Sequence, residues 1–171
     1  MTDNRLNYVK GDATTPLGEG KKYIVHICND IGGWGAGFVV ALSKRWIEPE
    51  RSYRLWYKEK YYIDRSTNKI LFNLGNIQEV PVTSDISVIN MIAQHNVFGM
   101  KDENGNILPP IRYDKLRRCL NKVAEMALKE NASVHMPKIG AGLAGGKWNI
   151  IEGIINDELV DRGIKTTVYI L

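Results

Sequence analysis

Cysteine is scarce in this chain, and long apolar runs are absent. Only Cys28 and Cys119 occur among 171 residues, and they form no CxxC pair. This scarcity argues against a disulfide framework or a cysteine zinc site and favours a reducing compartment. The N-terminus is polar, without the apolar core of a signal peptide, and no run approaches membrane-spanning length. We therefore expect a cytoplasmic protein with no membrane partner.

Histidine is also rare, and neither basic nor acidic residues dominate the charge of the chain. The three histidines, His26, His95 and His135, lack the spacing of metal ligands, so we expect neither a metal nor a cofactor. The net charge of +4 comes from 23 basic and 19 acidic residues that are spread along the chain. Nucleic-acid binding needs a longer basic stripe than this, whereas a modest positive field favours a small anionic ligand.

The remaining composition is typical of a globular protein. With 44% hydrophobic and 25% charged residues, we expect one domain over residues 1–171. Apolar and β-branched runs predict strands at Asn7–Lys10, Tyr23–Cys28, Ile70–Val80, Ile86–Ile92, Ser133–Met136 and Thr166–Ile170. Helical spacing predicts helices at 38–46, 48–60, 116–127 and 148–159, and residues 99–110 are expected to form a loop. This alternation predicts an α/β layer structure with helices on both faces of a buried sheet.

Two glycine-rich loops each lie between a predicted strand and a predicted helix. They are HICNDIGGWGAGF, residues 26–38, and MPKIGAGLAGGKW, residues 136–148. Glycine lets backbone N–H groups converge on a phosphate, and the next helix N-terminus adds partial positive charge. Because such loops meet at the carboxyl edge of a parallel sheet, the pair predicts a ligand that carries a diphosphate.

Known phosphate motifs fit these loops poorly. Gly140, Gly142 and Gly145 form a G-x-G-x-x-G, but a dinucleotide fingerprint normally lies in the first βα unit, and here only one strand follows. A P-loop fails because Trp148 occupies the Ser/Thr position that binds magnesium. Tight turns with helix caps remain an alternative explanation for either loop alone.

The sequence resembles the macrodomain family of ADP-ribose-binding modules from Tyr8 to Leu171. The resemblance rests on YVKGDAT at 8–14, the two glycine loops and TVYIL at 167–171, while residues 61–110 match least. It is similar to the branch that includes ADP-ribose-1''-phosphate phosphatases and the terminal ADP-ribose glycohydrolase. The resemblance implies a three-layer α/β/α fold around a mixed, largely parallel sheet of about six strands.

The resemblance also implies a role for each matched residue in binding ADP-ribose. Asp12 would accept a hydrogen bond from the adenine amino group, and Ala13 would offer its backbone N–H to the same ring. Tyr169 would form a wall of the adenine site. An Asp that caps a turn is the alternative for Asp12. The residues matching the phosphate and ribose contacts are Gly35, Ala36, Gly37, Gln94, Gly140, Ala141, Gly142, Leu143 and Ala144.

The catalytic residues that the resemblance implies lie beside the first loop. Gln94 and Ala144 occupy the positions of the glycohydrolase lysine and aspartate, so that branch's mechanism is not expected. His26 is the candidate acid or base, Asp30 the candidate orienting or second proton-transfer group, and Asn29 the amide that holds the distal ribose. The alternative for His26 is a structural histidine in the core. The alternative for Asn29 is an amide that hydrogen-bonds only to the backbone of its own loop.

These residues predict a hydrolase that removes the terminal phosphate of ADP-ribose-1''-phosphate. Two alternatives are a non-catalytic reader of ADP-ribose and an enzyme that removes mono-ADP-ribose. Their partners would be ADP-ribosylated protein or nucleic acid. A nicotinamide-dependent dehydrogenase is a more distant alternative.

Overall fold

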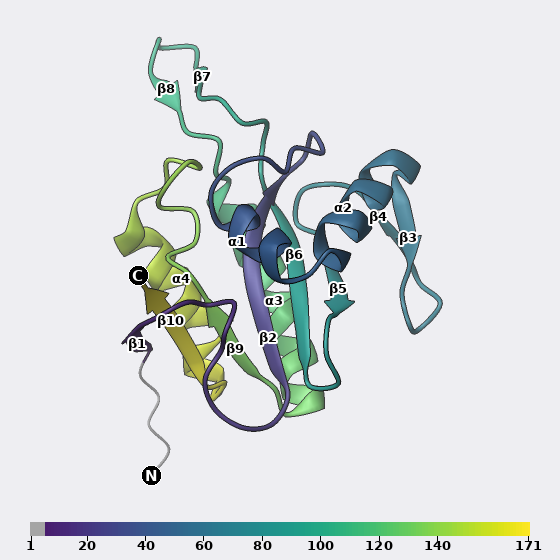
Figure 1. Cartoon of the computed structure of the whole chain (residues 1–171). Helices are drawn as coiled ribbons and strands as arrows, with labels where there is room; N and C mark the ends of the chain where they lie inside the picture. The colour runs from purple at the N-terminus through teal and green to yellow at the C-terminus, as the bar shows by residue number, and fades with distance from the viewer. Residues whose placement is uncertain (1–5) are drawn as a thin grey trace.

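The computed structural model describes residues 6–171 and shows a six-stranded sheet enclosed by helices (Figure 1). The strand order is β1-β10-β9-β2-β6-β5. The strands are β1 (Asn7–Lys10), β2 (Lys22–Asn29), β5 (Ile77–Pro81), β6 (Ile86–Gln94), β9 (Ser133–Met136) and β10 (Thr166–Ile170). Every pair is parallel except β5 with β6. The expected mixed, largely parallel sheet is therefore confirmed.

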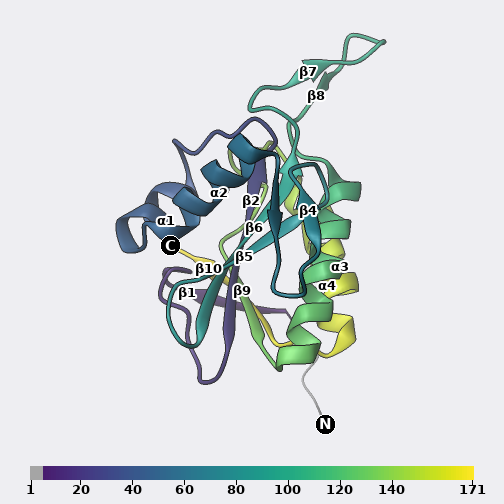
Figure 2. The same cartoon turned by 90° about the vertical axis from the view of Figure 1, so that its right-hand side faces the viewer.

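Helices cover both faces of this sheet (Figure 2). Helices α1 (Phe38–Arg45) and α2 (Glu48–Glu59) lie on one face. Helices α3 (Tyr113–Glu130) and α4 (Trp148–Glu158), with the short 3-10 helix η1 (Val160–Arg162), lie on the other. Within residues 6–171, no helix combines the length and apolarity that crossing a bilayer requires. The three layers follow from the alternation of strands and helices along the chain.

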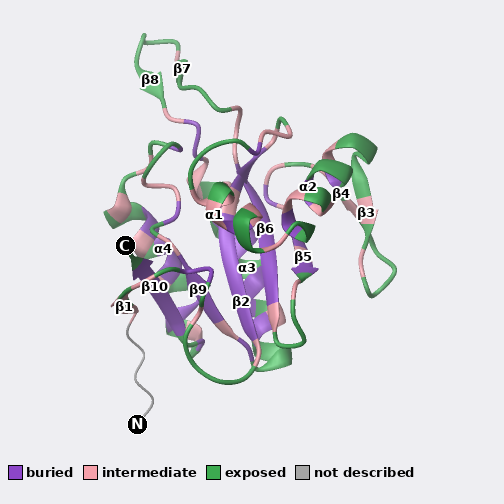
Figure 3. Ribbon diagram, in the orientation of Figure 1, coloured by how far each residue is buried: buried purple, intermediate pink, exposed green. Residues whose placement is uncertain are grey.

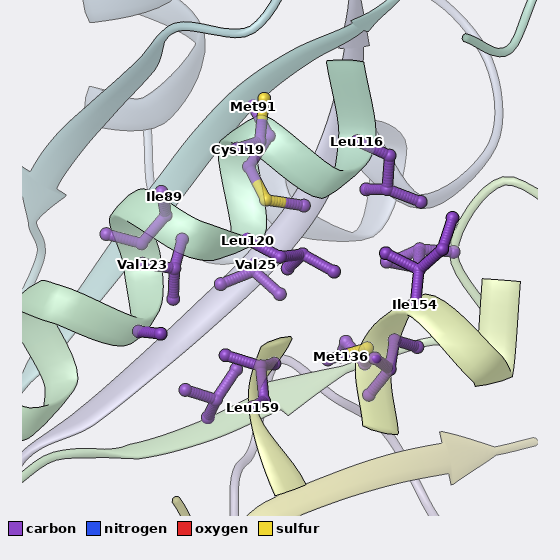
Figure 4. Close-up of a cluster of buried hydrophobic side chains, with 14 of the residues drawn as sticks. Val25, Ile89, Met91, Leu116, Cys119, Leu120, Val123, Met136, Ile154 and Leu159 are labelled. Carbon is purple, nitrogen blue, oxygen red and sulfur yellow. The ribbon is translucent and has the colours of Figure 1, made fainter. Parts of the chain in front are cut away.

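The alternating side chains of β2 divide the core into two clusters. Tyr23 and Val25 join the larger cluster under α3 and α4, where Leu116 and Ile151 are also fully buried. Val25 and Leu116 are labelled within this cluster in Figure 4. On the opposite face, Ile24 packs with residues of the first glycine loop, α1 and α2. Figure 3 shows that β2 is buried along most of its length. Strands that are buried on both faces have nearly continuous apolar sequences. The sheet is thus a rigid base for the loops at its ends.

One predicted strand is interrupted. The run at 70–80 was expected to be a single strand, but the structure has β4 (Lys69–Leu71) and β5 with a turn between them. Gly75 has a φ of 93°, and the Asn76 N–H donates to the Asn73 carbonyl, so this turn breaks the strand. β4 pairs with β3 (Tyr61–Ile63) in a separate hairpin, which the apolar pattern alone did not reveal.

The segment expected to be a loop at 99–110 contains a small hairpin. Its strands are β7 (Met100–Lys101) and β8 (Ile107–Leu108), joined through Gly105 at a φ of 80°. Asp102 supports the turn, because its carboxylate accepts the backbone N–H groups of Asn104 and Asn106. This hairpin projects from the body beyond the end of β6 (Figures 1 and 2). Strands of two residues are too short to give a periodic signal in the sequence.

Candidate functional site

The candidate site residues gather at one edge of the sheet. Asp12 follows β1, Asp30 follows β2, His95 follows β6 and the second glycine loop follows β9. Because these strands are parallel, their carboxyl ends emerge together, at the upper end of the sheet in Figure 1. Crevices at this edge are where open α/β sheets bind ligands.

The backbone of both glycine loops has free hydrogen-bond donors. Within residues 6–171, the N–H groups of residues 35–37 and 140–144 make no hydrogen bond to the protein. Gly35, Ala36, Gly37, Gly142 and Leu143 are exposed. The loops also approach each other, since a β-carbon on Gly37 would lie 3.5 Å from the Leu143 methyl group. Unsatisfied N–H groups on two adjacent loops that are largely open to solvent are a suitable site for phosphate oxygens.

The second loop depends on Gly140. Its φ is 72°, and a β-carbon there would lie 2.6 Å from Ile111, 3.0 Å from Ile151 and 3.1 Å from Ile27. The Gly140 carbonyl also accepts the Gly146 N–H at 2.7 Å, closing the loop on itself. Glycine is therefore required here for both conformation and space.

We expect Gly140→Ala to lower the free energy of unfolding by about 3 kcal/mol, from left-handed strain and overpacking together. Urea denaturation measures the loss. The matched control is Gly142→Ala, where a β-carbon meets nothing within 4 Å, and we expect a change within about 0.5 kcal/mol. Equal stability of the two variants would contradict this account of the loop.

Asn29 fixes the start of the first loop. Its side-chain amide donates to the Gly33 carbonyl, and its Oδ1 accepts from the N–H groups of Ile31 and Gly33 and from the Tyr53 hydroxyl. The residue is 9% exposed. These hydrogen bonds show that Asn29 holds the backbone of its own loop, as its alternative interpretation expected. Contact of Asn29 with a ribose stays a prediction.

Asp12 combines a turn with an open carboxylate oxygen. Its Oδ1 accepts the Thr14 N–H at 2.8 Å and the Thr14 hydroxyl at 2.9 Å. Within the described chain, Oδ2 has no hydrogen-bond partner, and the residue is exposed. The turn and the ligand contact are therefore compatible, because one oxygen serves each. Ala13 beside it is buried.

Tyr169 lies underneath this turn. Its hydroxyl accepts the Leu17 N–H at 2.8 Å and bonds Nδ1 of His135 at 2.7 Å, while a β-carbon on Gly11 would contact its ring. Tyr169 is 4% exposed. It supports the Asp12 turn in this structure, and its role as a wall of the adenine site stays a prediction.

Asp30 and His95 form a carboxylate–imidazole pair at the mouth of the site. Oδ2 of Asp30 lies 2.7 Å from Nδ1 of His95, and Oδ1 accepts the Asn96 N–H at 2.8 Å. The carboxylate therefore orients the ring so that Nδ1 carries the proton and Nε2 is left for chemistry. The His95 side chain is 43% exposed and that of Asp30 17%. This is an acid–base group that a substrate can reach.

A one-residue shift between β2 and β6 creates this pair. Cys28 is opposite Ile92, but Asn29 is opposite Gln94, so Ala93 is an extra residue in β6. Without the shift Asp30 would continue opposite Gln94 rather than His95. Bulges of this kind re-aim side chains next to functional sites. Sequence spacing alone carried no signal for this shift, and no catalytic role was predicted for His95, although its neighbour Gln94 was expected at the site.

His26 lies in the core instead of at the mouth. It is 2% exposed, its Nε2 lies 2.6 Å from Oδ1 of Asn90, and Trp34 packs edge-on against its ring. Burial lowers the pKa of His26 to about 4. A neutral, enclosed imidazole favours the structural alternative, and direct proton transfer by His26 stays a prediction.

Gln94 and Ala144, which the resemblance matched to the lysine and aspartate of the glycohydrolase branch, both make hydrogen bonds to the backbone of other residues. The Gln94 amide donates to the Asn96 carbonyl, and the Ala144 carbonyl accepts the Ile111 N–H. Ala144 is 5% exposed. Over residues 6–171, the structure also has no group of three or more His, Cys, Asp or Glu side chains that could hold a metal ion.

The chain has clear relatives, although no family model matches it. A solved protein of Bacteroides thetaiotaomicron is 52% identical, with a TM-score of 0.86 over 98% of this chain and 100% of that one. A macrodomain protein of Streptomyces coelicolor is 45% identical, with a TM-score of 0.79 over 98% of this chain and 99% of that one.

Two curated proteins extend the comparison. The mouse chromodomain-helicase-DNA-binding protein 1-like is 35% identical over 99% of this chain, which spans only 18% of that protein's length. The ADP-ribose 1''-phosphate phosphatase of Candida albicans is 26% identical over 89% of this chain and 92% of its own length. With the layered fold and the two facing glycine loops, the full-length similarity to the Streptomyces protein shows that this chain belongs to the macrodomain family.

Proposed function

We propose that this macrodomain binds ADP-ribose across the carboxyl edge of its sheet and hydrolyses a derivative of it at the distal ribose. The free N–H groups of residues 35–37 and 140–144 carry the binding proposal, since two facing sets of donors match two linked phosphates. The phosphatase name of the Candida albicans relative supports the same ligand class.

Asp12 sets the expected orientation of the ligand. Its open Oδ2 would accept the adenine amino group and disfavour guanine, whose carbonyl oxygen would face the carboxylate. The adenosine then lies at the Asp12 end of the cleft. The distal ribose lies toward Asp30 and His95, on the other side of the diphosphate.

We expect Asp12→Ala to weaken ADP-ribose binding by about tenfold or more, because a hydrogen bond to a charged group is worth about 1.5–3 kcal/mol. Isothermal titration calorimetry with ADP-ribose measures this change. Glu125→Ala removes an exposed carboxylate on α3 and should leave the affinity as it is. Undiminished binding by Asp12→Ala would count against this orientation, and absence of binding by the unmodified protein would overturn the proposal.

The Asp30–His95 pair is the proposed source of the chemistry. In ADP-ribose-1''-phosphate, hydrolysis breaks one P–O bond with water and gives ADP-ribose and inorganic phosphate. Nε2 of His95 would take the proton from the attacking water, and the resulting imidazolium would protonate the departing ribose oxygen. Asp30 would hold the ring and stabilise its positive charge.

The direct test is incubation of the protein with ADP-ribose-1''-phosphate while free phosphate is measured. We expect release that continues over many turnovers. Tight ADP-ribose binding without release would instead support the non-catalytic reader. Binding of NAD more tightly than ADP-ribose would favour the dehydrogenase alternative.

Removal of mono-ADP-ribose from a macromolecule is the second candidate. The exposure of His95, at 43% of its side chain, favours it, because a bulky group on the distal ribose would have room beside the ring. An ADP-ribosylated protein offered in place of the phosphate compound distinguishes the two substrates. Loss of the label from that protein, without phosphate release from the small compound, would select this candidate.

A further inference from the structure

One short segment, residues 109–112, returns from the β7–β8 hairpin and lies along the end of β6. The His95 N–H donates to the Pro110 carbonyl at 2.8 Å, and the Arg112 N–H donates to the Ala93 carbonyl at 2.8 Å. These two bonds accompany an isolated antiparallel bridge between the segment and β6. The backbone of the proposed base is therefore fixed by residues 109–112, which we call the bridge segment.

The bridge segment also contacts the second glycine loop. The Ile111 N–H donates to the Ala144 carbonyl at 3.1 Å, and a β-carbon on Gly140 would lie 2.6 Å from the Ile111 side chain. Directly after the segment, the Tyr113 hydroxyl accepts the Lys147 N–H at 2.9 Å. One short stretch of chain therefore joins the proposed base to the loop that is proposed to bind the diphosphate.

Arg112 holds the shape of the bridge segment. Its Nη1 lies 2.6, 3.1 and 3.1 Å from three consecutive carbonyl oxygens, those of Pro109, Pro110 and Ile111. Within residues 6–171, the carbonyls of Pro109 and Ile111 have no other hydrogen-bond partner. Carbonyl oxygens that face one point repel each other, and a guanidinium nitrogen between them replaces this repulsion with charge-assisted hydrogen bonds.

The Arg112 side chain has no second polar task in the part of the chain that the structure describes. Arg112 is the N-cap residue of α3, but its side chain makes no capping hydrogen bond. It also takes no part in a salt bridge among residues 6–171. The hydrogen bonds of its guanidinium therefore go to the bridge segment alone.

We propose that Arg112 is a positioning residue, which holds the bridge segment and so places His95 relative to the distal ribose. This inference rests on the proposed hydrolysis and adds a residue that acts through His95. A misplacement of about 1 Å in an active site can cost about 100-fold in rate. The second glycine loop also closes on itself, because the Gly146 N–H donates to the Gly140 carbonyl. Loss of Arg112 should therefore affect the rate more than the binding of ADP-ribose.

Arg112→Met keeps an unbranched side chain and removes the donors. We expect kcat for phosphate release from ADP-ribose-1''-phosphate to fall about tenfold or more, while the affinity for ADP-ribose changes less than about threefold. Arg112→Lys restores an ammonium with three donors and should recover most of the rate. Arg118→Met removes the same charge from the exposed side of α3 and should keep the full rate. Equal losses of rate and affinity in Arg112→Met would overturn the positioning role.

Nuclear magnetic resonance of the His95 ring tests this role without any reaction. At about pH 9, where an ordinary histidine is neutral, the nitrogen-15 shifts report which ring nitrogen carries the proton. We expect the Nδ1–H form in the unmodified protein, because Asp30 lies 2.7 Å from Nδ1, and a mixture of both forms in Arg112→Met. Arg112→Lys should show the Nδ1–H form again. If Arg112→Met does not fold, Arg112→Gln, which is shorter than arginine, takes its place in both experiments.

Unchanged ring shifts in a folded Arg112→Met or Arg112→Gln would overturn the positioning role, whether or not the protein is a hydrolase. The opposite result is also distinguishable. Ring shifts that respond as expected, in a protein that releases no phosphate, would overturn the proposed hydrolysis and leave the contact between Arg112 and the bridge segment as the device that orients His95.

Discussion

Replacement of His95 by alanine is expected to slow phosphate release from ADP-ribose-1''-phosphate by about 100-fold or more, the usual contribution of a positioned acid–base group. ADP-ribose affinity should change little, because the binding donors lie in the glycine loops. Asp30→Asn keeps the size of the side chain but removes the charge that holds the imidazole proton on Nδ1. We expect a loss of similar order from it. Steady-state phosphate release and ADP-ribose calorimetry separate the two effects.

The same assay distinguishes His95 from His26. Glu103→Ala, in the exposed turn between β7 and β8, is the nearby control and should retain the full rate. His26→Gln tests the buried histidine. A full rate in His95→Ala together with an inactive, folded His26→Gln would transfer the catalytic role to His26.

Acid is expected to unfold this protein through two buried histidines. Burial lowers the pKa of His26, and also that of His135, from 6.5 to about 4. Unfolding returns each ring to water and its ordinary pKa, so the unfolded chain binds more protons between these values. The contribution of these two neutral rings to the free energy of unfolding is therefore complete above pH 6.5, and it is lost as the pH falls toward 4. At about 1.4 kcal/mol per pKa unit, each histidine contributes about 3 kcal/mol.

Two such contributions are comparable with the whole stability of an ordinary domain. Urea denaturation at intervals between pH 7.5 and 4 should show the free energy of unfolding falling by about 2.7 kcal/mol per pH unit at its steepest. His135→Gln should halve that slope, whatever its effect on stability at neutral pH. A free energy that stays level down to pH 4.5 would contradict the assignment of both rings as buried and neutral.

The sheet and its helices could be predicted well because they depend on side-chain periodicity. Strand β2, for example, is apolar from Tyr23 to Cys28 except at His26, and α3 repeats Leu116, Cys119, Leu120 and Val123 on one side. The interruption at Asn73–Asn76 was missed because Ile70 to Val80 is mostly apolar whether or not Gly75 turns the chain. The β7–β8 hairpin depends on a local turn around Asp102, which leaves no periodic trace.

For the site, local patterns located the loops but not the contacts between strands. The free N–H groups follow from glycine composition, and Asp12 from its position after β1, so both could be read along the chain. The pairing of Asp30 with His95 joins residues 65 positions apart, and it depends on strand register. The burial of His26 likewise depends on Asn90 and Trp34, which only the packed structure brings to the ring.

The bulge at Ala93 means that strand register, and not only residue identity, decides which side chain faces Asp30. In a homologue whose β6 kept a regular register through the residue equivalent to Ala93, the residue before the histidine, here Gln94, would face the position of Asp30. Two homologues with the same AQH tripeptide could therefore differ in activity. Conversely, deletion of the residue equivalent to Ala93 from such a regular strand would place its histidine opposite Asp30, and this is a route by which hydrolysis could arise on a scaffold that only binds.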